Sequence, residues 1–167
     1  MIRRLARELG PNIDIPEPNI MTAPQPLLWM VPEYEALQAG RCPGFITGKP
    51  VGMGGSLGRT EATGYGVVFT IREALKEGDI RPESTTASVQ GFGNVAQYAA
   101  INFIEMLGGK VVCVSCWDRE DRTSYTFARE EGIDPYFLQK ITDQYGTIDK
   151  DEAKRAGYTV EDGDAWL

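Results

Sequence analysis

A glycine-rich turn between two strand-like segments constrains the fold of this chain more than any other feature. Residues 86–89 favour a strand, and the turn Gly91-Phe92-Gly93-Asn94-Val95-Ala96 begins two residues later. Apolar side chains at helical spacing then lead to Gly108-Gly109, and a second strand-like run covers residues 111–114. The order strand, glycine turn, helix, strand is typical of the first βα unit of a dinucleotide-binding fold.

Each small residue of this turn has a physical role. Gly91 permits the tight turn off the strand, Gly93 lets backbone N–H groups approach a pyrophosphate, and Ala96 lets helix and strand pack closely. The helix N-terminus would then face the phosphates with unpaired N–H donors and a positive dipole end. The pattern predicts nucleotide binding, and a βα turn with a purely structural role is the alternative.

The composition restricts the class of partner. The 167 residues carry a net charge of −7, which argues against nucleic acid or an anionic membrane surface as the main partner. No apolar run approaches the ~20 residues of a membrane span. The chain has no histidine, and this excludes histidine-based catalysis and histidine metal ligands within it.

The cysteines indicate a reducing, cytoplasmic location. Their number, three, is odd and does not suit a disulfide framework. Cys113 and Cys116 have the C-x-x-C spacing, but they lie on a predicted buried strand, where residues three apart face opposite sides. We therefore predict two buried strand cysteines and no metal site, with a metal or redox role as the alternative.

The rest of the chain is predicted to be mostly helix and loop. The segment 59–77 is expected to be a helix with Thr60 as its N-cap and with close packing at Gly64 and Gly66. The charged segment 117–130 is predicted to be a surface loop. Helices are also expected over 134–145 and 149–156, the second of them capped by Asp149.

Several motifs in the same order resemble the glutamate dehydrogenases of the Glu/Leu/Phe/Val dehydrogenase family. These motifs are DIPEPN at residues 14–19, GFITGKP at 44–50, GGSLGRTEATGYG at 54–66 and QGFGNV at 90–95. Members of this family use NAD or NADP to deaminate an amino acid oxidatively, which gives a 2-oxo acid and ammonia.

The resemblance implies a fold and a division into domains. It implies an α/β fold with a partial Rossmann-like, doubly wound parallel sheet that follows the end of a substrate domain. Residues 1–55 would form the C-terminal part of the substrate domain. Residues 56–167 would form the first half of the NAD(P)-binding domain.

The resemblance also assigns cofactor contacts. Arg59 and Thr63 would lie near the nicotinamide carboxamide. The turn would contact the pyrophosphate and its ribose through Gly91, Phe92, Gly93, Asn94 and Val95. The end of the second strand would lie near the adenosine ribose through Ser115, Cys116 and Asp118.

The choice between NAD and NADP depends on that strand end. Cys116 occupies the position at which an acidic residue is expected, and Asp118 follows it. An acid favours NAD because it can bind the ribose 2′-OH, whereas Arg119 or Arg122 could pair with the 2′-phosphate of NADP. The acidic side chains that follow Cys116 favour NAD.

One position departs from the family's catalytic pattern. Asn19 stands where the family has a catalytic Asp, and an amide cannot take or give a proton at neutral pH. The loss of a positioned acid or base typically costs ~10²–10⁴ in rate. The family's catalytic lysine is expected upstream of residue 1 and its pocket-closing residues downstream of residue 167, so Lys49 is not that lysine.

These expectations leave two functions open. The chain is interpreted as a portion of an amino-acid dehydrogenase, with glutamate as the substrate of the complete enzyme, and as inactive in isolation. The alternative is a non-catalytic nucleotide-binding or regulatory homologue that docks on full-length dehydrogenase subunits. In either case we expect a homo-oligomer or docking to other dehydrogenase chains, because a half-built parallel sheet leaves an open strand edge.

Overall fold

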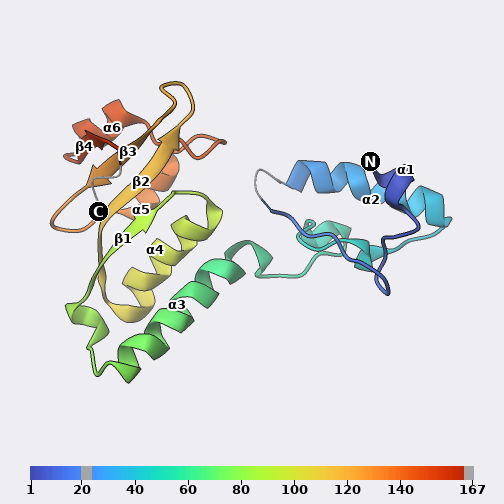
Figure 1. Cartoon of the computed structure of the whole chain (residues 1–167), viewed down its shortest axis with the longest axis horizontal. Coiled ribbons are helices and arrows are strands. Elements are labelled where there is room, and N and C mark those ends of the chain that lie inside the picture. Colours follow the sequence, from blue (N-terminus) through green and yellow to red (C-terminus); the bar gives the residue numbers. More distant parts are fainter. Residues whose placement is uncertain (20–23, 164–167) are drawn as a thin grey trace. The chain divides into compact units, whose positions relative to one another are not determined.

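The computed structural model describes residues 1–19 and 24–163, which fall into two compact units, 1–60 and 61–167. In unit 1 the structure has helices α1 (Ile2–Leu5) and α2 (Pro24–Gln38) and the 3-10 helices η1 (Pro43–Phe45) and η2 (Val51–Met53) (Figure 1). The assignment of the two units to a substrate and a cofactor domain stays a prediction.

Unit 1 is held together by one side of α2. Leu27, Val31 and Tyr34 recur at helical spacing and are buried. The ring of Tyr34 stacks on that of Phe45 with 3.9 Å between centroids, and its hydroxyl donates a hydrogen bond of 2.7 Å to the carbonyl oxygen of Leu9. These contacts connect the N-terminal segment, α2 and the loop that follows it.

Unit 2 contains a sheet with the strand order β1-β2-β3-β4. The strands β1 and β2 are parallel and joined by α4, whereas β3 and β4 continue the sheet in antiparallel pairing. The α/β class predicted from the sequence is confirmed, although the pairing is mixed. The elements of this region are α3 (Arg59–Glu77), η3 (Pro82–Ser84), β1 (Thr86–Gln90), α4 (Asn94–Leu107), β2 (Lys110–Asp118), β3 (Thr123–Ala128), α5 (Pro135–Lys140), α6 (Lys150–Arg155) and β4 (Thr159–Asp162).

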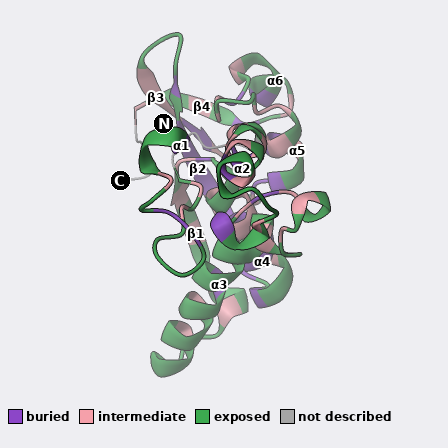
Figure 2. Cartoon of the chain, turned by 90° about the vertical axis from the view of Figure 1, so that its right-hand side faces the viewer, coloured by how far each residue is buried: buried purple, intermediate pink, exposed green. Residues whose placement is uncertain are grey.

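The core of unit 2 is centred on β2. Val111, Val114 and Cys116 are buried in one apolar cluster with Phe103 of α4 and Phe127 of β3 (buried residues are purple in Figure 2). Ala87 pairs with Val111 and Ser88 with Cys113, so Val112 is an extra residue in β2, a β-bulge. Because of this bulge, Val111 and Val114 both reach the core although they are three residues apart.

The predicted surface loop over 117–130 is wrong. Trp117 and Asp118 complete β2, and residues 123–128 form β3, which pairs with β2 from Cys113 to Asp118. The charges that suggested a loop are concentrated in the turn between the strands. The sequence Thr-Ser-Tyr-Thr-Phe of β3 is rich in β-branched and aromatic residues, which favour a strand.

The helix predicted over 134–145 is shorter than expected. Asp134 caps α5 by accepting hydrogen bonds from the backbone N–H groups of Tyr136 and Phe137, but the helix ends at Lys140. Thr142 then forms a β-bridge with Ile148, so the chain turns back after α5 instead of continuing as a helix. The cap predicted at Asp149 is confirmed at the start of α6.

The bounds predicted for α3 are confirmed, but two details of the prediction are wrong. The helix begins at Arg59, so Thr60 lies inside its first turn instead of capping it. A Cβ added to Gly64 would lie 2.5 Å from the Cβ of Tyr98 and 2.9 Å from the backbone nitrogen of Ala99, which confirms close packing on α4. At Gly66 an added Cβ would meet nothing within 4 Å.

This contrast gives a matched pair of substitutions. We expect Gly64→Ala to lower the free energy of unfolding by about 1–3 kcal/mol, because the methyl group would force α3 away from the α4 backbone. Gly66→Ala should raise it by up to about 1 kcal/mol through helix propensity alone. Urea unfolding followed by circular dichroism measures both, and equal effects would contradict the α3–α4 contact.

Candidate functional site

The glycine turn lies between the end of β1 and the start of α4. Gly91 has φ of 80°, a left-handed conformation that suits glycine. Gly93 is the N-cap of α4 and supplies no side-chain cap. The side chain of Gln97 donates a hydrogen bond of 2.9 Å to the carbonyl oxygen of Phe92 and accepts one of 3.0 Å from Gln139, and these bonds tie the turn to α4 and α5.

The space in front of this turn is open. A Cβ added to Gly93 would meet nothing within 4 Å, and Asn94 and Val95 are exposed. Phe92 points the other way and is buried in the core. The start of α4 therefore offers its positive dipole end and backbone N–H groups to an anion, and a pyrophosphate fits this arrangement.

The end of β2 lies beside the turn. Gln90 pairs with Ser115, and this register places Gly91 next to Cys116. The side chains predicted to face the adenosine ribose are nonetheless buried: Ser115, Cys116 and Asp118 are all at most 4% exposed. Burial raises the pKa of the Cys116 thiol, so the thiol stays protonated near neutral pH. Trp117, between them, is exposed.

Asp118 is held by a charged network. Its carboxylate accepts a hydrogen bond of 2.7 Å from the Nζ of Lys150 in α6, and also accepts the backbone N–H groups of Glu120 and Asp121 at 2.8 and 3.0 Å. Lys150 also donates to Asp121, which accepts a 2.7 Å hydrogen bond from the hydroxyl of Tyr125. The network thus joins α6 to the turn between β2 and β3.

The network shifts the pKa values of its members. The hydrogen bond from Lys150 and the backbone N–H groups lower the pKa of Asp118, and the bonds from Lys150 and Tyr125 lower that of Asp121. Partial burial opposes the charge of Lys150, but the hydrogen bonds to the two carboxylates outweigh it and raise its pKa. All three groups are therefore charged at neutral pH.

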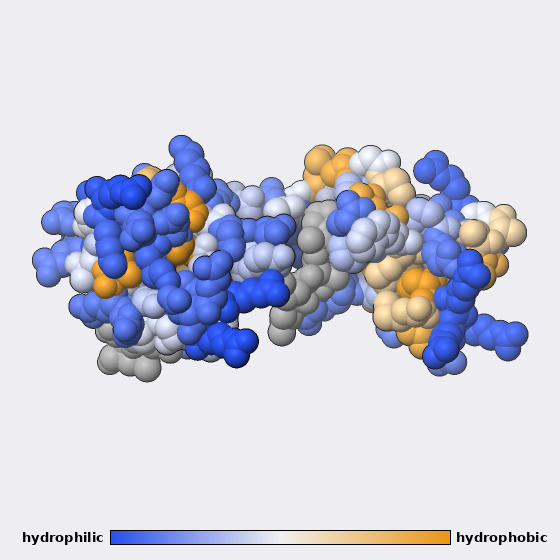
Figure 3. Space-filling model, turned by 90° about the horizontal axis from the view of Figure 1, so that it is seen from above, coloured by the Kyte–Doolittle hydropathy of each residue, from blue (hydrophilic) through white to orange (hydrophobic). Residues whose placement is uncertain are grey.

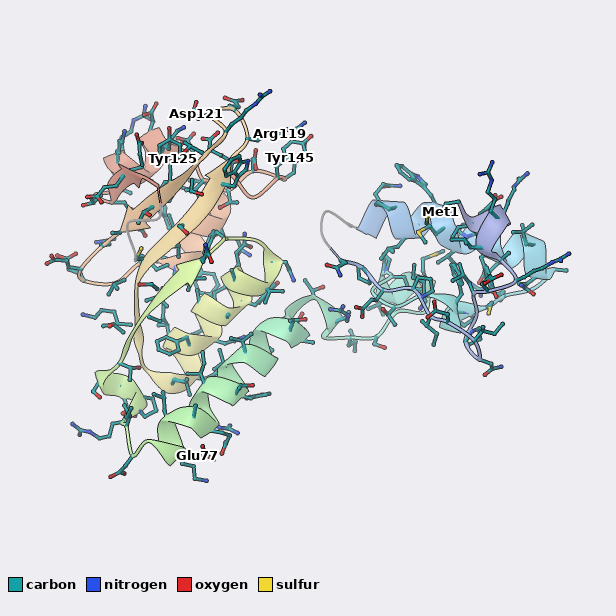
Figure 4. All side chains as sticks on the ribbon, viewed as in Figure 1. Met1, Glu77, Arg119, Asp121, Tyr125 and Tyr145 are labelled. Carbon is teal, nitrogen blue, oxygen red and sulfur yellow. The ribbon has the colours of Figure 1, made fainter. Side chains whose placement is uncertain are left out.

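A cavity of about 840 Å³ opens at this end of β2. Six acidic and three basic side chains line it, and the basic ones are Arg119, Lys140 and Lys150. The guanidinium of Arg119 lies 4.6 Å from the ring centroid of Tyr145, and Figure 4 shows the two side chains together near the turn that carries Asp121. The face of unit 2 visible in Figure 3 is largely hydrophilic.

The remaining predicted site residues lie elsewhere. Arg59 is the half-buried first residue of α3, and Thr63 lies exposed one turn later. Asn19 is exposed and belongs to unit 1. Cys113 and Cys116 are free thiols, and residues 1–19 and 24–163 contain no cluster of metal-ligating side chains and no helix long and apolar enough to cross a membrane.

Sequence reasoning missed Lys150, Tyr125 and Gln139. Lys150 is 32 residues from Asp118 and lies in an ordinary charged helix, so no spacing pattern connects the two. Gln139 reaches Gln97 over 42 residues. Both contacts depend on tertiary packing: α5 lies against α4, and α6 brings Lys150 to the end of β2.

The network makes stability depend on pH. Since the pKa of Asp118 is lower in the folded chain, its contribution is present above its ordinary value of about 4 and is lost as the pH falls through the folded value. We expect Lys150→Met to lower the free energy of unfolding at neutral pH by about 1–3 kcal/mol. The deficit should shrink as Asp118 becomes protonated.

Urea unfolding of the wild type and of the variant, at neutral pH and at about pH 2, where Asp118 becomes protonated in the folded chain as well, measures this change. Lys154→Met is the control, because the described residues show no ion pair for this lysine of the same helix. A deficit that is the same at both pH values would contradict the assigned role of the Lys150–Asp118 pair.

Comparison with known proteins places these features in a family. The family model for Glutamate/Leucine/Phenylalanine/Valine dehydrogenase matches residues 54–166. The NAD-specific glutamate dehydrogenase of Peptoniphilus asaccharolyticus is 46% identical over 134 residues, which are 80% of this chain and 31% of that protein. The chain thus spans about a third of the length of this relative.

Solved structures show the same relationship. The crystal structure of Plasmodium falciparum glutamate dehydrogenase matches with a TM-score of 0.84 at 28% identity, over 98% of this chain and 34% of the other. The hetero-hexameric glutamate dehydrogenase of Thermus thermophilus in its Leu-bound form matches with a TM-score of 0.78 at 27% identity, over 89% and 34%. The glycine turn, the order of the elements around it and these matches together show that the chain belongs to the Glu/Leu/Phe/Val dehydrogenase family.

Proposed function

We propose that this chain is the central portion of an NAD-dependent glutamate dehydrogenase. The complete enzyme would oxidise glutamate to a 2-oxo acid and release ammonia. The observation that carries the proposal is the open start of α4 after Gly91, where the N-cap Gly93 has no side chain to cap the helix. The name of the Peptoniphilus relative, an NAD-specific glutamate dehydrogenase, supports both the substrate and the cofactor.

In this proposal the pyrophosphate of NAD lies at the start of α4. Backbone N–H groups from Gly91 to Val95 would hold it, and the helix dipole would stabilise its charge. Arg59 and Thr63 would orient the nicotinamide, and the backbone at Ser115 and Cys116 would lie along the adenosine ribose. The side chains of these two residues contribute little in the present conformation because they are buried.

The charge at the strand end favours NAD over NADP. The cavity there is lined by twice as many acidic as basic side chains. A 2′-phosphate placed in it would add negative charge to a negative surface, whereas the 2′-OH of NAD adds none. This charge balance agrees with the sequence-based preference for NAD.

Bound NAD would supply the acceptor for the hydride that leaves the amino-acid Cα. The chain's own contribution is to bind and orient the cofactor. At the catalytic position, Asn19 can donate or accept hydrogen bonds, and so can orient a substrate amine, but it cannot transfer a proton as an Asp would. We therefore propose that the 167 residues alone bind the cofactor without turning over substrate.

We further propose that the chain works in an assembly. The described sheet leaves β1 as an edge strand with one side unpaired, and an exposed edge invites pairing with another segment. The Thermus relative is named as a hetero-hexamer, which supports association with other dehydrogenase chains.

One observation favours a second function. Asn19, at the position of the family's catalytic Asp, suits a non-catalytic homologue that binds nucleotide and docks on full-length subunits to regulate them. The native mass of the isolated protein distinguishes the two. A stable complex with intact dehydrogenase subunits supports the docking homologue, whereas self-association, or association with other pieces of a dehydrogenase, supports the portion of an enzyme.

A substitution at the N-cap of α4 tests cofactor binding. Gly93 has φ of −77° and ψ of −174°, which an aspartate adopts readily, and Asp is a preferred N-cap. We expect Gly93→Asp to keep or raise the melting temperature but to weaken NADH binding by about tenfold or more, equivalent to about 1.4 kcal/mol, because its carboxylate would repel the pyrophosphate. Calorimetric titration with NADH measures this.

The matched control for this test is Gly66→Ala, which lies in α3 and meets no neighbouring atom. It should leave the affinity for NADH unchanged. If Gly93→Asp binds NADH as well as the wild type does, the glycine turn is a structural feature only and the proposed cofactor site is wrong.

Catalysis by the isolated chain is tested directly. We expect no L-glutamate-dependent formation of NADH by the purified 167 residues, and none after Asn19→Asp, because groups outside this segment are needed. Absorbance of NADH at substrate saturation is the measurement. Turnover by either form would show that the segment carries a complete catalytic site.

A further inference from the structure

The side chain of Lys150 can reach a ligand, but its positive charge is compensated by neighbouring carboxylates. Lys150 lines the cavity at the end of β2, and its side chain is 28% exposed, so it is within reach of a ligand. Its positive charge is nevertheless committed to Asp118 and Asp121. The ammonium also lies 4.1 Å from the ring centroid of Tyr125, which covers it from another side.

The cavity lies at the end of β2, where the adenosine ribose of a bound dinucleotide is expected. Asp118 lies two residues beyond Cys116, which is about 7 Å along the strand from the position beside Gly91. A dinucleotide with its pyrophosphate at the start of α4 extends its adenosine ribose across the ends of the parallel strands β1 and β2. In the proposed binding mode, the 2′ position of that ribose would lie on the side of Asp118, Arg119 and Lys150.

Of the three basic side chains that line the cavity, Arg119 follows the end of β2 directly and Lys150 is bonded to it through Asp118, and these two differ in availability. Arg119 stacks on Tyr145, and the described residues show no carboxylate bound to it. Lys150 is compensated by two carboxylates, which leaves the three-member group with a net charge of −1. Of the two, only Lys150 could be exposed to a phosphate by removing its partners.

We propose that Lys150 is a masked specificity-determining residue of the nucleotide site: Asp118 and Asp121 withhold its charge, so that this edge accepts a ribose 2′-OH and rejects a 2′-phosphate. The proposal rests on the proposed NAD site. It adds a residue of α6 to the discrimination between the two cofactors. The ligand class is the adenosine end of a dinucleotide.

The test compares the ratio of the dissociation constants for NADPH and NADH, measured by calorimetric titration of the 167-residue chain. We expect the wild type to bind NADH more tightly. The double variant Asp118→Asn/Asp121→Asn should lower the ratio by about tenfold or more, because the unmasked ammonium can form a charge-assisted bond to the 2′-phosphate. The amide that replaces the carboxylate of Asp118 keeps an oxygen to accept the backbone N–H groups at positions 120 and 121.

Two further substitutions in this double variant show which cation causes the gain in affinity for NADPH relative to NADH. Adding Lys150→Met should restore the high ratio, whereas adding Arg119→Met should leave the ratio low. A merely structural role of the network would change both affinities together and leave their ratio constant. If the double variant melts below the assay temperature, Asp121→Asn alone, which leaves Asp118 in place, should give a smaller change in the same direction.

The outcomes separate the inference from the function on which it rests. An unchanged ratio in the double variant, or a gain that survives Lys150→Met, would overturn the role of Lys150. A gain that disappears with Arg119→Met would assign the discrimination to Arg119 instead. If the wild type binds neither nucleotide, the proposed function itself fails and the inference fails with it.

Discussion

Unit 2 depends on the pairing of β2 with a strand on each side. The parallel pairing with β1, through the crossover α4, brings the carboxyl ends of both strands to one edge, and this edge is where α/β sheets bind their ligands. After a short turn, β3 runs antiparallel to β2 and pairs with its second half. The strand is thus paired on both sides from Cys113 to Ser115, carries much of the core and ends in the charged residue that α6 holds in place.

The parts of the fold that depend on local pattern could be predicted from the sequence. The glycine turn, the bounds of α3 and the cap at Asp149 follow from residue types and spacings within a few positions. The strand β3 could not be found this way because the charges of the preceding turn dominate its composition. The end of α5 depends on the bridge between Thr142 and Ile148, which is a tertiary contact.

The candidate site could likewise be predicted from the sequence only in part. Gly91 and Gly93 could be placed from the sequence, since a strand and a helix must meet at this turn. The burial of Ser115, Cys116 and Asp118 could not, because it depends on β3 and α6 covering the strand end. The predicted site residues belong to both units: the glycine turn lies in unit 2, whereas Asn19 lies in unit 1.

The extra residue in β2 determines which side chains reach α6. Side chains alternate across a strand, so each residue inserted or removed exchanges the two faces from that point onward. With Val112 bulged out, Val114, Cys116 and Asp118 share the face that meets the core and Lys150. In a regular strand of the same sequence, anchored at Val111, that face would carry Cys113, Ser115 and the large ring of Trp117, and the lysine would meet an indole instead of a carboxylate. A one-residue bulge at Val112 thus determines which side chain faces Lys150 at the end of the strand, and places a carboxylate there instead of an indole.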